Sequence, residues 1–178
     1  MKIVKIVFIT MCLLTIQSNV NAQKVGIRAG LNISNVSGAE GDTKPLTGFH
    51  LGVFKEITIV PELFFLQPEL QYSMQGDQVG DTKRSIGYIN IPVLAKVYII
   101  KTISLEAGPQ IGFKINDNFE GDTGDDIKTF DTAFVGGLGY NFPMGLSLNA
   151  RYALGLSEIV KDSGLKNQVI QLGAAFKF

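Results

Sequence analysis

The last eleven residues, QVIQLGAAFKF, constrain the fold of this chain more than any other feature, because their side chains alternate in character. Counting back in steps of two from Phe178 gives Phe176, Ala174, Leu172 and Ile170, and the residues between them are mostly small or polar. Successive side chains of a β-strand point to opposite faces, so a period of two indicates a strand with one apolar face and one polar face.

The same alternation recurs along the chain. It is strict in KVGIRAGLNIS at 24–34 and continues in six further segments, at 46–55, 63–73, 86–97, 103–113, 131–141 and 146–156. No segment has a helical period, so the chain is predicted to be all-β with eight strands.

The first residues, MKIVKIVFITMCLLTIQSNVNA, have the build of a secretory signal peptide. Lys2 and Lys5 precede an apolar run, and small residues end the segment before Gln23. The run is shorter than the roughly 20 residues that a membrane-spanning helix needs. We therefore expect cleavage after Ala22, a signal peptide at 1–22 and a barrel domain at 23–178, which would lack cysteine and carry a formal charge of −2.

The connections between the predicted strands alternate in length. Long polar connections are expected at 35–45, 74–85, 114–130 and 157–167, and short ones at 56–62, 98–102 and 142–145. Long and short connections then lie at opposite ends of the strands, which is the plan of an outer-membrane barrel. The hypothesis is an antiparallel up-and-down transmembrane β-barrel whose four long loops face outward from the cell and could contact an extracellular partner.

Charged residues within the predicted strands fall on the face opposite the large apolar side chains, namely Arg28, Glu69, Lys96, Glu106 and Arg151, together with His50. A soluble lipocalin-like barrel that binds a small apolar ligand would show the same period with the faces exchanged. The signal peptide, the unequal connections and the aromatics near strand ends favour the membrane barrel.

Several stretches resemble, in order and spacing, the small PorT-like outer-membrane β-barrel family of Gram-negative bacteria: FLQPELQYS, YINIPVLAKVY, LEAGPQIGF, FVGGLGYNF and LSLNARYALGLSEI. The resemblance implies a porin-like barrel in the outer membrane, surrounded by lipid. It also implies that Phe176 and Phe178 form a signal read by the barrel-assembly machinery. Relatives often carry an acid before the IP of the fourth strand, where this chain has Asn90.

The polar face predicts a lumen network of Arg28, His50, Glu69, Lys96, Glu106 and Arg151. An eight-stranded barrel is only wide enough to be filled by its inward side chains, and buried charges must be paired. A lumen plugged by hydrogen-bonded side chains is therefore favoured, and a narrow gated pore or ligand site is the alternative.

Catalysis and cofactors are not expected. His50 is the single histidine, and no serine stands in a nucleophile-elbow context. Lysines and arginines are scattered among acids, so nucleic acid is not an expected partner. The segment NDNFEGDTGDD at 116–126 has part of the spacing of a calcium loop, but Ile127 stands where a bidentate glutamate is needed, so a solvated acidic loop is favoured.

Overall fold

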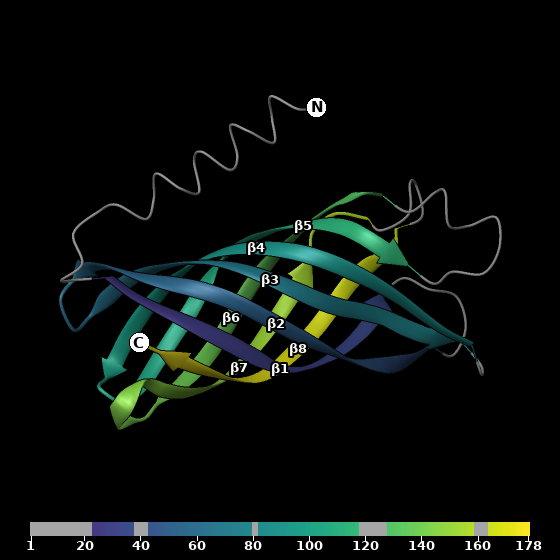
Figure 1. Cartoon of the computed structure of the whole chain (residues 1–178). Helices are drawn as coiled ribbons and strands as arrows, with labels where there is room; N and C mark the ends of the chain where they lie inside the picture. The colour runs from purple at the N-terminus through teal and green to yellow at the C-terminus, as the bar shows by residue number, and fades with distance from the viewer. Residues whose placement is uncertain (1–22, 38–42, 80–81, 118–127, 159–163) are drawn as a thin grey trace.

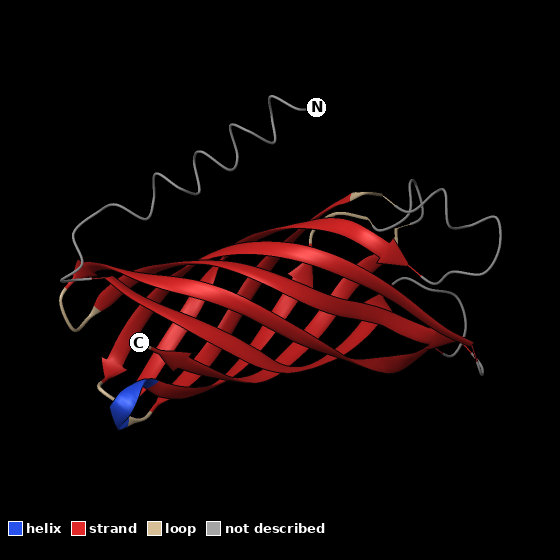
Figure 2. Cartoon of the chain, viewed as in Figure 1, coloured by secondary structure: helices blue, strands red, loops and turns tan. Residues whose placement is uncertain are grey.

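The computed structural model describes residues 23–37, 43–79, 82–117, 128–158 and 164–178, and these residues form one closed barrel (Figure 1). Its strands are β1 (Gln23–Ser37), β2 (Thr43–Val60), β3 (Phe64–Val79), β4 (Thr82–Ile100), β5 (Ile103–Asp117), β6 (Phe130–Asn141), β7 (Leu146–Gly155) and β8 (Lys166–Lys177). Each strand pairs antiparallel with the next, and β8 pairs with β1 to close the ring. The predicted eight-stranded up-and-down barrel is confirmed (Figure 2).

Residues that alternate in the sequence point alternately into the barrel and onto its outer surface. In β7, Leu148, Ala150 and Tyr152 face outward, whereas Asn149 and Arg151 are buried within the barrel. The other strands follow the same rule, so the large apolar side chains are exposed on the outer surface and most buried side chains are polar. A soluble lipocalin-like barrel needs the opposite arrangement, and that alternative is therefore wrong.

The two ends of the barrel differ. The turn end carries the connections β2–β3, β4–β5 and β6–β7, at 61–63, 101–102 and 142–145, together with the C-terminus. The loop end carries the other four connections. Among the described residues, no helix is long and apolar enough to cross a membrane.

Two of the predicted long loops were placed wrongly. β3 and β4 remain paired as far as Val79 and Thr82, so most of 74–85 is strand. β1 and β2 likewise extend to Ser37 and from Thr43, into the predicted loop at 35–45. The physical reason is that backbone pairing continues beyond the point where one face must be apolar, so the hydrophobic alternation ends before the strand does. The connections β5–β6 and β7–β8 are close to the predicted bounds.

One glycine is required by the tight β6–β7 turn, which contains the short 3₁₀ segment η2 (Pro143–Gly145). Gly145 has a φ of 88°, a conformation that other residues adopt only with strain. A Cβ atom there would also lie 2.3 Å from the Lys177 carbonyl oxygen. The turn can therefore pack against the end of β8 only because this position has no side chain.

Aromatic side chains pair near both ends of the barrel. Tyr140 and Phe142 stack edge to face at the turn end, with ring centroids 4.8 Å apart, and Phe176 and Phe178 pair there at 5.3 Å. Towards the loop end, the rings of Phe113 and Phe130 lie 5.6 Å apart. Aromatic girdles of this kind are typical of barrels whose two rims lie at the membrane–water interfaces.

Candidate functional site in the barrel interior

Glu69 of β3 is the centre of the interior, and its side chain is fully buried. Both of its carboxylate oxygens lie 3.0 Å from Nη1 of Arg28, on β1. The amide groups of Gln67 and Gln71, the inward neighbours of Glu69 on β3, also donate to the carboxylate. Desolvating a carboxylate costs several kcal/mol, and hydrogen bonds from this many donors offset that cost.

Arg151 carries the network across the barrel. It extends from β7, which lies opposite β3 in the ring, and its Nη1 and Nη2 atoms donate to the two oxygens of Glu69 at 3.0 and 2.8 Å. Its Nε atom donates to Glu106 of β5 at 2.7 Å. Gly137 of β6 lies between Glu106 and Arg151 in the register, and a Cβ atom there would approach Cγ of Arg151 to 2.6 Å. The missing side chain of β6 leaves room for this contact.

A second branch leads from Glu106 to the turn end. Lys96 of β4 lies 3.2 Å from Glu106 and 2.9 Å from Glu56 of β2. The other Glu56 oxygen accepts from Nζ of Lys177 at 2.8 Å. The hydroxyl of Tyr98 donates to Glu56 at 3.3 Å and accepts from Lys177 at 3.1 Å.

These contacts form one continuous ion-pair chain of alternating sign: Arg28, Glu69, Arg151, Glu106, Lys96, Glu56 and Lys177. Every described strand except β6 contributes one member. The three carboxylates balance the three cations that are at least 97 % buried, and the fourth cation, Lys177, keeps 18 % of its side chain exposed at the turn end. The chain therefore ties the walls together without an uncompensated charge in its interior.

His50 of β2 belongs to a neighbouring neutral group. Its Nδ1 atom lies 2.9 Å from Oδ1 of Asn32, whose own Nδ2 atom shares its two hydrogens among Oγ of Ser73 and the carbonyl oxygens of Phe49 and Met74. These acceptors fix the orientation of the amide, so Nδ1 of His50 carries the proton and Nε2 is left as an acceptor.

Glycines make room for the His50 ring. A Cβ atom on Gly30 would lie 2.8 Å from Cε1 of His50, and one on Gly173 would lie 2.9 Å from its Nε2. Gly30 and Gly173 face each other across the β1–β8 pair. The imidazole thus lies against a floor of bare backbone.

Apolar side chains form a further layer inside the barrel. Leu94, Val135, Ala153 and Val169 are buried together, and in the register they form the next inward row towards the loop end from Lys96, Glu106 and Arg151. A second buried cluster joins Val36, Ile86 and Tyr88. A layer of charged side chains is thus followed, towards the loop end, by a layer of apolar side chains.

The six residues predicted to line the lumen are all buried, but they lie in two groups. Arg28, Glu69, Lys96, Glu106 and Arg151 lie together in the ion-pair chain, while His50 lies in the neutral group beside it. Glu56 was missed because residues 56–62 were interpreted as a turn. Extending the even-numbered inward positions of β2 by one step past Phe54 would have found it.

Two predicted features, the acidic loop and the signal peptide, lie wholly or mostly outside the described residues. Residues 118–127 lie outside the described residues, so the acidic loop at 116–126 and its calcium-like spacing remain a prediction. The signal peptide at 1–22 also lies outside them. In the part of the chain that the structure describes, no group of three or more histidine, cysteine, aspartate or glutamate side chains could hold a metal ion. Phe178 follows the last strand and donates its backbone N–H to the Val25 carbonyl oxygen at 2.9 Å.

Comparison with known families decides the class of this barrel. The family model for the outer membrane protein beta-barrel domain matches residues 17–161. The chain belongs to this family. Its outward apolar surface is therefore the surface that faces lipid, and its buried polar network is the lumen of a membrane barrel.

Solved structures share the fold at low sequence identity. Ail, the attachment invasion locus protein of Yersinia pestis, is 16 % identical with a TM-score of 0.56, and the match covers 88 % of this chain and 99 % of Ail. Neisserial surface protein A is 13 % identical with a TM-score of 0.59, covering 88 % of this chain and 97 % of that one. OprG of Pseudomonas aeruginosa is 13 % identical with a TM-score of 0.50, covering 88 % and 96 %. No curated protein matches.

Proposed function

We propose that this protein is an integral outer-membrane barrel of a Gram-negative bacterium whose lumen is closed by side chains and whose loop end contacts an extracellular partner or surface. The observation that carries the proposal is the ion-pair chain, because Arg151 reaches from β7 to Glu69 on the opposite wall. The proposal assigns no catalytic activity and no cofactor.

Closure of the lumen is supported by two different barriers. The guanidinium group of Arg151 and the carboxylates that it joins occupy the centre of the barrel. The apolar row that contains Leu94 and Val135 lies next to it towards the loop end. Water and ions would have to separate buried ion pairs and then wet an apolar constriction, and both steps are costly.

The proposed contact with an extracellular partner involves the connections at the loop end of the barrel. Barrels of this kind have short turns on the periplasmic side and longer loops on the extracellular side, which would place the β5–β6 and β7–β8 connections outside the cell. Structures with the same fold include one named an attachment invasion locus protein and one named a surface protein. We propose contact with a partner through the four loop-end connections.

Membrane fractionation with surface proteolysis tests this placement. Intact cells and spheroplasts are treated with a protease, with an epitope tag inserted after Gly121 in the β5–β6 connection and a matched tag inserted after Lys101 at the turn end. The protein should sediment with outer membranes, and only the Gly121 tag should be cleaved in intact cells. A soluble periplasmic protein, or cleavage at Lys101 alone, would contradict the proposal.

We also propose a family subgroup, a cleaved signal peptide and an assembly signal for this protein. The family stretches quoted above support a PorT-like subgroup, and the charged and apolar pattern of residues 1–22 supports a signal peptide cleaved after Ala22. Phe176 and Phe178 pair on the outer face at the end of β8, where the barrel-assembly machinery would meet an aromatic signal.

A narrow gated pore is the second candidate, and one observation favours it. Several buried polar atoms have no hydrogen-bond partner among the described residues, including Nε of Arg28, Nε2 of His50 and Oε1 of Gln71. Buried polar atoms of this kind usually pair with water. A few waters beside the ion-pair chain would be the starting point for a conducting path.

A further inference from the structure

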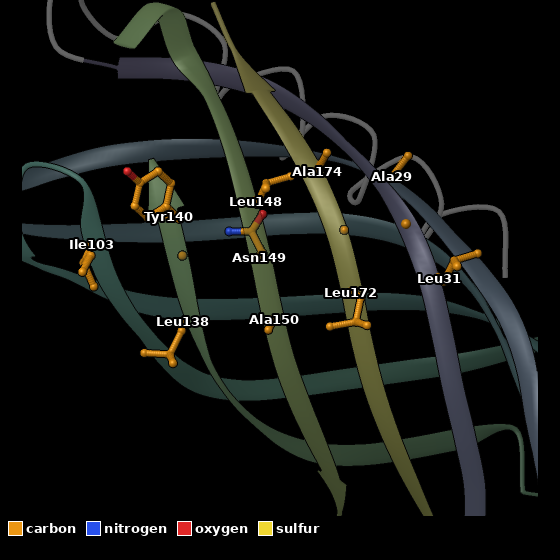
Figure 3. A pocket seen from close by; sticks show the side chains of 13 residues that line it. Ala29, Leu31, Ile103, Leu138, Tyr140, Leu148, Asn149, Ala150, Leu172 and Ala174 are labelled. Carbon is orange, nitrogen blue, oxygen red and sulfur yellow. The ribbon is translucent and has the colours of Figure 1, made fainter. Parts of the chain in front are cut away.

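The outer face of the barrel carries a groove of about 750 Å³, which lies across β1, β8, β7, β6 and the start of β5 (Figure 3). Its volume is within the range of roughly 300 to 1,000 Å³ that is typical of ligand sites. The groove lies on the lipid-facing side of the wall and is separate from the ion-pair chain.

The register explains why the surface is hollow here. One outward row pairs Ile103 with Tyr140, Tyr140 with Leu148, Leu148 with Ala174 and Ala174 with Ala29. The next outward row pairs Leu138 with Ala150, Ala150 with Leu172 and Leu172 with Leu31. Alanines at three of these positions lower the surface between leucines that are about half exposed.

The floor of the groove is backbone. Between the two outward rows runs a row of inward positions, in which Gly139 pairs with Asn149, Asn149 with Gly173 and Gly173 with Gly30. Only Asn149 has a side chain, and it is buried towards the lumen. The floor therefore consists of glycine backbone, and the walls of methyl and isobutyl groups, with the phenol of Tyr140 at one end (Figure 3).

The groove has a direction in the membrane. At one end it meets Ala29 and Leu31 near the middle of β1, and at the other it meets Ile103, the first residue of β5, and Tyr140, next to the last residue of β6. It therefore runs from the middle of the barrel to the turn end. Four strand-to-strand steps of about 4.8 Å give a length of about 19 Å across the strands. Because strands in a barrel are tilted by about 35 to 45°, the groove rises about 11 to 14 Å along the barrel axis, close to the roughly 15 Å of half a bilayer's hydrocarbon core.

A positive charge lies in the turn next to this end of the groove. Lys101 is exposed in the β4–β5 turn, two residues before Ile103. The turn is held beside the end of β6, because Asn141 donates its N–H to the Thr102 carbonyl oxygen at 2.6 Å. An ammonium group and a phenol hydroxyl thus stand where the apolar groove reaches the membrane–water interface.

We propose that this groove binds one acyl chain of a glycerophospholipid from the leaflet at the turn end, with the lipid phosphate near Lys101 and Tyr140. A narrow groove between leucine ridges fits a flexible hydrocarbon chain, which can contact floor and walls together. A second barrel would present a convex surface that rests on the ridges. The orientation of the lipid rests on the proposed membrane placement, whereas occupancy of the groove does not.

Native mass spectrometry of the purified full chain, delipidated and then titrated with dipalmitoyl phosphatidylglycerol, tests the proposal. Wild type should retain one lipid per barrel. Ala150→Phe fills the groove and should weaken binding at least about tenfold, because the ring clashes with the chain. Ala107→Phe is the matched control, since Ala107 is an outward alanine that does not line the groove. Lys101→Gln should weaken binding about two- to fivefold, the range for an exposed ion pair.

Three results would overturn the proposal: equal binding by Ala150→Phe and Ala107→Phe, several lipids bound without a preferred first one, or a dimer that forms in place of the one-lipid complex. Migration of each variant as a folded barrel in a gel-shift assay shows that lost binding is not lost folding. A lipid bound by a protein that fractionates outside the outer membrane would leave the groove valid and the proposed function wrong, so the two failures are distinguishable.

Discussion

Neutralising Glu69 should destabilise the barrel more than neutralising Glu106, although both carboxylates are fully buried. In Glu69→Gln, Arg28 loses the carboxylate with which it pairs, while Arg151 keeps Glu106. In Glu106→Gln, Arg151 keeps Glu69 and Lys96 keeps Glu56. The difference follows from the order of charges along the chain, because only the first substitution leaves a cation without a carboxylate.

The expected loss in the free energy of unfolding depends on how many buried cations are left without a carboxylate. Breaking a buried ion pair by removing one partner costs about 3 to 5 kcal/mol, so Glu69→Gln should lower the free energy of unfolding by about that amount. Glu106→Gln removes charge-assisted hydrogen bonds but leaves each cation paired, and should cost about 1 to 3 kcal/mol. The double variant Arg28→Met, Glu69→Gln removes the stranded cation and should recover more than half of the Glu69→Gln loss.

Urea unfolding in lipid vesicles, followed by the gel shift between folded and unfolded barrels, measures these free energies. Gln67→Glu is a control that adds a charge beside Glu69 instead of removing one. It should also lower the free energy of unfolding, because any added or removed charge disturbs the balance of the network. Equal losses for Glu69→Gln and Glu106→Gln, or a double variant no more stable than Glu69→Gln, would refute the argument from paired charges.

Three further variants probe other parts of the barrel. Deleting Phe178 should lower the amount of protein assembled in the outer membrane more than the heat resistance of barrels already folded, as measured by immunoblot and gel shift. Gly173→Val places a side chain against both the Ala29 carbonyl oxygen and the His50 ring and should cost about 1 to 3 kcal/mol in the same urea assay, whereas an unchanged midpoint would show that the wall has room for a side chain here. Leu94→Ala opens a cavity at a fully buried position and should cost about 2 to 5 kcal/mol, and a loss below 1 kcal/mol would show that the apolar layer is loosely packed.

The sequence predicted the barrel well because one physical rule governs every strand. A wall between lipid and a narrow lumen needs apolar and polar side chains in alternation, and segments such as 24–34 and 146–156 have that pattern in full. The same rule placed Arg28, Glu69 and Arg151 inside.

The inward apolar layer, the ends of the strands and the pairing of the charges could not be predicted from alternation alone. Leu94 and Val135 are apolar and yet point inward, because a narrow interior can pack apolar side chains as well as pair charges. The segment 74–85 that joins β3 to β4 is rich in polar residues and glycine, so its sequence resembles a loop although the backbones are paired as far as Val79 and Thr82. Which cation meets which carboxylate depends on the stagger of the strands, which brings β7 to β3 across the barrel and which no single segment encodes.

Conductance of the purified monomer in a planar lipid bilayer tests the closed lumen most directly. The account predicts no stable open state for the wild-type protein, because Arg151 bridges Glu69 and Glu106 across the interior and the Leu94 layer lies beside them. Glu69→Gln with Leu94→Ala should give brief, small openings as water enters to solvate the arginines. Steady, large and solute-permeable openings of the wild-type barrel would contradict the account and make the pore its function.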